Sequence, residues 1–226
     1  MIDVHIHITA SSAPQSSGLS AGEALRFASL NGYRAAALIL RHGGLDIHDL
    51  TPLSDDIKKL GLHTNMEALL GVELVHIPPA LLPQAVKNMR SSGADIVLVH
   101  GETLLEPVAE GTNFAAIDAG ADILAHPGLI DETAASYAAE RGVPLELSSA
   151  PRHAFANAHL IAMARRFGCT LLPGSSAHTA QDIYPPSLRN RLYQGAGMTV
   201  KELSLLRQHA EKFIQNKLMQ NKKQKF

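Results

Sequence analysis

Residue types that bind metal ions recur at the ends of short apolar runs along this chain of 226 residues. The first run, residues 2–8, contains His5 and His7, and two strand residues at this spacing point to the same face. Five more such residues each end or follow a later apolar run: His42, Glu73, His100, His126 and His178. A single histidine on an apolar face is usually a packed core residue. Seven ligand-type residues at the ends of strand-like segments instead predict a shared metal site.

The apolar runs alternate with amphipathic segments that have helical periodicity. The runs are 2–8, 34–40, 69–76, 95–100, 122–126, 143–148 and 169–174, and the helical patterns are 20–31, 52–62, 79–92, 111–120, 131–141 and 153–168. The runs lack strict alternation, as expected for parallel strands that are buried on both faces. An open sheet would hold its outer strands too far apart to share one ion. We therefore predict an α/β fold, a distorted (βα)7 TIM-like barrel with its ligands at the mouth.

The C-terminal segment has a different pattern from the rest of the chain. Residues 199–220 predict a long amphipathic helix with a single apolar stripe, and Thr199 with Glu202 forms a capping-box signature. We assign residues 1–198 to the barrel. Residues 199–226 are assigned to a helix that packs on the barrel and ends in a frayed basic tail from Asn221 onward.

The overall composition argues against several classes of protein. The chain is 46% hydrophobic and 18% charged, with a net charge of −1, so no global field favours nucleic acid or membranes. The single cysteine, Cys169, excludes an intramolecular disulfide. No apolar stretch reaches the length of a membrane span, and no secretory signal opens the chain. We expect a cytoplasmic enzyme with a small-molecule substrate and neither a membrane nor a nucleic-acid partner; the oligomeric state is not readable.

The ligand types indicate which ions the site would hold. Imidazole and carboxylate groups bind divalent first-row ions such as Zn, Mn and Fe. His5, His7 and Glu73 could hold one ion. The second oxygen of Glu73 could bridge to another ion held by His100 and His126. His42 and His178 remain for a third position.

The order and spacing of these motifs resemble the PHP family (polymerase and histidinol phosphatase domains), in particular the histidinol-phosphatase-like proteins. The resemblance covers about residues 2–185. It is carried by Asp3-x-His5-x-His7, Arg41-His42-Gly43, Gly71-Val72-Glu73, Val99-His100-Gly101-Glu102, Leu124-Ala125-His126-Pro127-Gly128 and Ser176-Ala177-His178, with Glu146-Leu147-Ser148, Arg152-His153 and Asn157-Ala158-His159 similar to a subgroup. It implies a distorted seven-stranded barrel that holds two or three metal ions and hydrolyses phosphoesters.

Three positions depart from the pattern of that family. No acidic or histidine ligand follows the first motif near Ser12, Arg41 stands where the family has Asp, and Ser176 stands where it has another Asp. Each change removes a ligand or a negative charge. We therefore expect two ions, with the third position the most weakened. Arg41 could offset the loss by binding a phosphate oxygen directly.

Other residues near the expected mouth have predicted roles. Arg152 could bind phosphate, and Glu102 could face the substrate. His153 or His178 could protonate the leaving group. Asp3 is expected to orient its neighbours rather than to bind a metal.

The leading prediction is a metal-dependent phosphoric monoester hydrolase in which metal-activated water attacks phosphorus. Two alternatives remain open. The lost acidic ligands could mark a degenerate scaffold that has been reused for partner or RNA binding. An amidohydrolase-type barrel also begins with His-x-His, but it expects a bridging lysine on a middle strand and an aspartate on the last, and neither is present here.

Overall fold

Seven parallel strands form one sheet that curves into a barrel. The computed structural model describes residues 1–9 and 18–224. The strands are β1 (Ile2–His7), β2 (Ala35–His42), β3 (Glu67–Leu74), β4 (Ile96–His100), β5 (Ile123–Ala125), β6 (Leu145–Ser148) and β7 (Leu171–Gly174), hydrogen-bonded in chain order. The last gap is bridged just beyond β7, where His7 N donates to Ala177 O at 2.8 Å. The predicted distorted seven-stranded barrel is confirmed.

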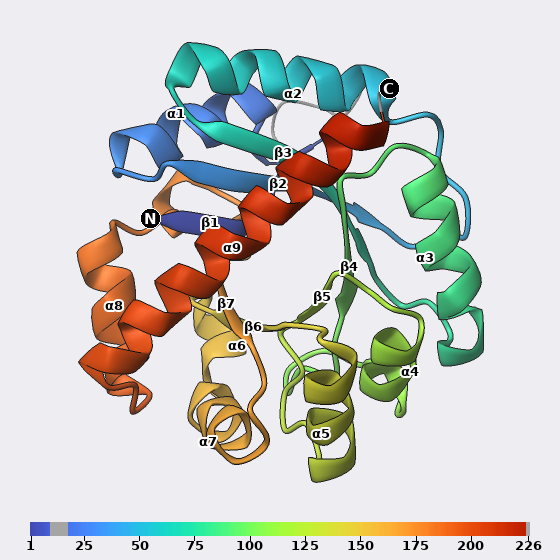
Figure 1. Ribbon diagram of the computed structural model, residues 1–226, viewed down its shortest axis with the longest axis vertical. Helices are drawn as coiled ribbons and strands as arrows, with labels where there is room; N and C mark the ends of the chain where they lie inside the picture. The colour runs from blue at the N-terminus through green and yellow to red at the C-terminus, as the bar shows by residue number, and fades with distance from the viewer. Residues whose placement is uncertain (10–17, 225–226) are drawn as a thin grey trace.

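Helices surround the strands on the outside (Figure 1). They are α1 (Ala21–Leu30), α2 (Thr51–Thr64), α3 (Leu82–Ser91), α4 (Thr112–Asp118), α5 (Glu132–Arg141), α6 (Pro151–Ala154), α7 (Asn157–Phe167), α8 (Pro186–Gly195) and α9 (Val200–Gln224). Ser20 caps α1 in the capping box with Glu23 that the sequence suggests. Helix α8, which begins at Pro186 with proline in its first turn, was not predicted.

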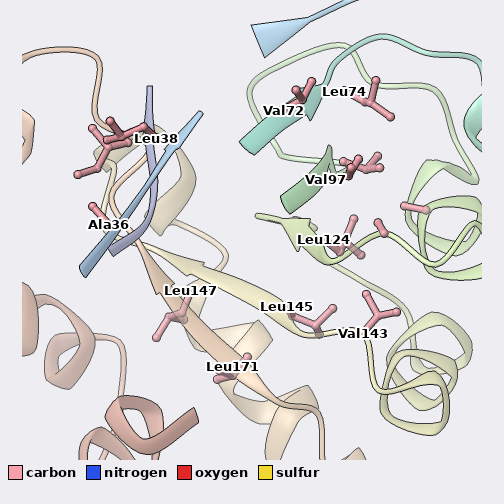
Figure 2. Close-up of a cluster of buried hydrophobic side chains, with 14 of the residues drawn as sticks. Ala36, Leu38, Val72, Leu74, Val97, Leu124, Val143, Leu145, Leu147 and Leu171 are labelled. Carbon is pink, nitrogen blue, oxygen red and sulfur yellow. The ribbon is translucent and has the colours of Figure 1, made fainter. Parts of the chain in front are cut away.

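Every strand except β6 contributes to two apolar layers. One face packs against the helices, as Leu38, Val72 and Leu124 do in Figure 2. The other face fills the barrel interior near the amino ends of the strands, where Val4 and Leu69 belong to a separate cluster. Burial on both faces is the reason why the strands read as continuous apolar runs.

Helix α9 crosses the barrel at the amino ends of the strands (Figure 1). Ala210 and Ile214 join the interior cluster, and Lys217 binds the Asp122 carboxylate just before β5. The helix continues to Gln224, and Asn221 Nδ2 donates to Asp95 Oδ1 at 2.7 Å. Residues 225–226 lie outside the described part of the chain.

Within the described residues, no helix combines the length and apolar character needed to cross a bilayer.

A buried ion pair fixes α8 against β1. Arg189 is fully buried, donates from Nη1 to Asp3 Oδ2 at 3.0 Å, and lies over the ring of Tyr33. The pairing register of β1 shifts between Asp3 and Ile6. In a regular strand Asp3 and His5 would share a face. The irregularity lets Asp3 meet α8 while His5 points into the barrel.

We expect Arg189→Ala to lower the free energy of unfolding by about 3–5 kcal/mol, because it leaves the Asp3 carboxylate buried without its partner. Urea unfolding followed by circular dichroism measures this change. Arg165→Ala is the control, since Arg165 pairs with Glu202 at the surface, where water screens the charges. Equal shifts of the urea midpoint in both variants would contradict the assignment.

Candidate metal centre

Five buried ligand-type side chains meet at the carboxyl ends of the strands. They come from β1, β3, β4 and the residue after β5: His5, His7, Glu73, His100 and His126. Glu73 lies at the centre of the group. Its Oε2 atom is 3.8 Å from His5 Nε2 and 3.7 Å from His7 Nε2.

The other oxygen of Glu73 faces the second pair of histidines. Glu73 Oε1 lies 3.0 Å from His100 Nδ1 and 3.4 Å from His126 Nε2. These two imidazole nitrogens are themselves 2.9 Å apart. The carboxylate therefore presents one oxygen to each pair of histidines, and each group of three places its ligand atoms within 4.8 Å of one another.

Unpartnered polar atoms concentrate in this cluster. Among the described residues, five buried side-chain nitrogen or oxygen atoms lack a hydrogen-bond partner, and four of them belong to this group: His5 Nε2, His7 Nδ1, Glu73 Oε2 and His100 Nε2. Buried polar atoms are normally paired, so this concentration calls for a binding partner. Imidazole and carboxylate donors fit a divalent ion. The residues present thus fit the metal that the motifs predict.

The charges within the cluster depend strongly on one another. Burial alone would lower the pKa of His5, but the Glu146 and Glu73 carboxylates raise it to about 9. Burial opposes the charged form of both carboxylates as well, yet the neighbouring histidines hold the pKa of each well below its usual range. Desolvation lowers the pKa of His7 and His126.

Unusual backbone conformations turn side chains inward at the strand ends. His126 has φ 62° and Ser176 has φ 48°, in the left-handed region that non-glycine residues seldom adopt. The turn after His126 is tight, because a Cβ on Gly128 would lie 2.0 Å from Glu102 O. This turn ends the strand and leaves the His126 ring facing His100.

Two carboxylates at the site were missed in the sequence. Glu146 lies in β6, fully buried, with Oε2 2.9 Å from His5 Nδ1 and 2.8 Å from His126 Nδ1. A signal was available, since a carboxylate between Leu145 and Leu147 is exceptional in a buried strand. Glu106 comes from the loop after β4 and carries no comparable signal.

A cavity of about 180 Å³ opens beside the cluster. Arg41, Glu106, Arg152 and His153 line it together with His100 and His126, and Ser176 and His178 contribute to its wall. Glu106 lies 3.8 Å from Arg41 Nη2 and 3.7 Å from Arg152 Nη1. The cavity therefore joins the candidate metal centre to two cationic groups.

Two predicted site residues lie elsewhere. The His42 ring is 3.0 Å from Asp46 O, and it lines a second cavity, which His7, Arg41 and His178 also line. The Glu102 carboxylate accepts from Asn113 N at 2.8 Å, and Glu102 is absent from the residues that line the cavity. The exposed His178 stacks on His7 with ring centroids 4.1 Å apart. Ser12 falls outside the described residues.

Asp3 and Ser176 act on neighbouring groups. Asp3 Oδ1 accepts from the backbone N–H groups of His5 and Ser175 at 3.1 and 3.0 Å. Ser176 Oγ donates to Glu146 Oε1 at 3.1 Å. Both side chains therefore form hydrogen bonds to residues in or beside the cluster.

Comparison with known proteins gives one clear relative. No family model matches the chain. Uncharacterized protein MJ1295 from Methanocaldococcus jannaschii is 38% identical over 158 residues, which cover 70% of this chain and 72% of that protein. The chain belongs to the same family as MJ1295.

Solved structures resemble this barrel at low sequence identity. A chain in the cryo-EM structure of archaeal ribonuclease P with mature tRNA matches with a TM-score of 0.68 and 17% identity, over 96% of this chain and 91% of that one. Histidinol phosphate phosphatase from Lactococcus lactis was solved with zinc, L-histidinol and phosphate. It matches with a TM-score of 0.58 and 16% identity, over 88% of this chain and 94% of that one. A Xaa-Pro dipeptidase matches with a TM-score of 0.52 and 14% identity, over 91% of this chain and 74% of that one. These similarities show that this chain shares its barrel fold with proteins of several activities.

The pKa of His5 predicts that ion binding releases a proton. A pKa of about 9 keeps His5 protonated at pH 7, while lowered pKa values keep His7 and His126 neutral. Binding an ion at His5 Nε2 requires loss of that proton, so we expect release of about one proton per His5 at pH 7, about half a proton near pH 9 and little at pH 10. The affinity should rise with pH over the same window.

Titration calorimetry with zinc in buffers of different ionisation enthalpy measures this release. His153→Ala is the matched control, because burial lowers the pKa of His153 to about 3 and the ring is already neutral at pH 7. Proton release that stays constant from pH 7 to pH 10 would contradict the prediction.

Proposed function

We propose that this chain is a metal-dependent hydrolase of phosphoric monoesters, similar to histidinol phosphatases, that acts on a small phosphorylated substrate. The observation that carries the proposal is the convergence of five buried ligands around Glu73, four of which have a side-chain atom without a hydrogen-bond partner. Divalent ions in such centres activate water and neutralise charge on phosphoryl oxygens. His5 and His7 would hold one ion, His100 and His126 a second, and Glu73 would bridge them.

The two arginines of the cavity support a phosphate ester over other substrates. Arg41 Nε lies 3.5 Å from Glu73 Oε2, so its guanidinium group is next to the candidate ions. Arg152 is placed across Glu106 from it, with 63% of its side chain exposed. Guanidinium groups match the geometry of phosphate oxygens. A phosphate dianion would compete with Glu106 for both.

Protonation of the leaving group falls to one of two histidines at the cavity. Burial lowers the pKa of both His153 and His178, the former to about 3, so neither ring carries a proton at pH 7 in this arrangement. An adjacent phosphate dianion would raise both values, because it stabilises imidazolium. We assign the proton transfer to His178, since its exposed ring has less desolvation to overcome and can exchange protons with water.

The geometry favours two ions over three. His42 and His178 line a second cavity, which His7 also lines, and the His42 ring is directed to the Asp46 carbonyl group. His178 stacks on His7 and lines the main cavity, but neither His178 nor His42 belongs to the groups of described residues whose ligand atoms converge. Zn, Mn or Fe would suit the nitrogen-rich ligand set.

The two competing functions make different demands on the site. An amidohydrolase-type centre would use a bridging lysine, and within the described chain no lysine lines the cavity. A scaffold that binds RNA or a partner has no need of bound metal. The similarity to a chain of ribonuclease P concerns the fold, and the ion content of the purified protein separates this alternative from hydrolysis.

We expect Glu73→Ala and His126→Ala to abolish bound metal and to lower hydrolysis of a phosphomonoester such as p-nitrophenyl phosphate by more than about 100-fold, since even residues that only orient ligands contribute 10–100-fold. His63→Ala is the control, because His63 is exposed on α2. Mass spectrometry of bound metals and initial rates give both readouts. Wild-type metal content and wild-type rates in Glu73→Ala and His126→Ala would contradict the proposal.

Arg41→Ala should lower kcat/KM for the same ester by roughly tenfold to 100-fold, the effect of losing one charged hydrogen bond to phosphate. We expect Arg165→Ala on α7 to leave it unchanged, because Arg165 pairs with Glu202 far from the cavity. Steady-state kinetics with the metal-loaded protein distinguish the two. An unchanged kcat/KM for Arg41→Ala would remove Arg41 from phosphate binding.

A further inference from the structure

Glu146 contacts both halves of the candidate metal centre at once. Its carboxylate is fully buried in β6, and a single oxygen, Oε2, lies within hydrogen-bond distance of His5 Nδ1 at 2.9 Å and His126 Nδ1 at 2.8 Å. The other oxygen, Oε1, accepts from Ser176 Oγ at 3.1 Å. An ionised carboxylate can only accept, so both Nδ1 atoms donate.

This arrangement decides which nitrogen of each ring is free. With Nδ1 carrying a proton, Nε2 remains as the ligand atom of both His5 and His126. Both Nε2 atoms face Glu73, at 3.8 Å from Oε2 and 3.4 Å from Oε1. The two rings lie nearly parallel, with an interplanar angle of 14°. Each ring belongs to a different half of the cluster.

The neighbouring strand is shaped around this carboxylate. Gly174 of β7 faces it, and a Cβ built there would lie 2.0 Å from Glu146 Oε1 and 2.6 Å from its Cδ. Any other residue at this position would push the carboxylate away from the histidines. The position of the Glu146 carboxylate therefore depends on the absence of a side chain at Gly174.

We propose that Glu146 is a positioning residue that sets the tautomer and orientation of one ligand in each half of the metal centre, and so couples the two ion positions. The proposal rests on the proposed metal-dependent function. A carboxylate behind a ligating histidine is a common support in metal sites. Here one oxygen supports two histidines from strands that are not adjacent, so its loss affects both positions together.

Glu146→Gln tests this proposal. Glutamine keeps the size, and its carbonyl oxygen can take the place of Oε2, but it carries no negative charge, so both Nδ1–H donors lose a charged acceptor and the two rings become poorer ligands. We expect affinity at both ion positions to fall by about 10–100-fold, measured by competition with a chromophoric zinc chelator. The control is Asp95→Asn. Asp95 lies just before β4, its side chain is 6% exposed, and its carboxylate pairs with Lys58 of α2. This substitution should leave both affinities unchanged.

Gly174→Ala provides an independent variant that keeps Glu146 and its charge but displaces it. It should lower both affinities as Glu146→Gln does. Nitrogen-15 NMR of zinc-loaded wild-type protein adds a readout that a purely structural role would not move. We expect protons on Nδ1 of His5 and His126, with Nε2 bound.

Nε2–H tautomers in the wild type, or wild-type ion affinity in both variants, would overturn the role of Glu146 while leaving the proposed function intact. A wild-type protein that binds two ions but hydrolyses no phosphomonoester would overturn the proposed function instead. Loss of ions in both variants would then still support the role of Glu146.

Discussion

Burial of carboxylates among imidazole rings is the constraint on which the rest of this structure depends. Glu73 and Glu146 are withdrawn from water inside the barrel, where an uncompensated charge would be strongly unfavourable. His5 and His126 lie beside both and supply the compensation. Four side-chain atoms of the cluster remain without a hydrogen-bond partner, and its imidazole and carboxylate groups fit a divalent cation.

The barrel separates this polar centre from the groups that hold the fold together. Apolar side chains such as Val4 and Leu69 fill the amino half of the interior, and α9 covers that end. The ligands occupy the carboxyl half, where the strands diverge and the loops add Arg41, Glu106 and Arg152.

Two positions that differ from the PHP pattern, Arg41 and Ser176, contact the buried carboxylates of the site. Ser176, which stands where an aspartate was expected, donates a hydrogen bond to Glu146, whereas a carboxylate there would repel it. Arg41 lies against Glu73 and places a positive charge beside the cluster. The rim of the site therefore has Arg41 and Ser176 at these positions, and the buried histidine cluster lies beneath it.

The sequence by itself determined the seven strand-helix units, their parallel closed arrangement, and the convergence of His5, His7, Glu73, His100 and His126. These follow from local periodicity and from the meeting of parallel strand ends. Only the tertiary structure decided that His42 and Glu102 turn away and that Glu146 and Glu106 belong to the site. It also decided which nitrogen of each ring faces inward. Those outcomes depend on the irregular register of β1, on left-handed residues after β5 and β7, and on loop paths, all of which are set by contacts between distant segments.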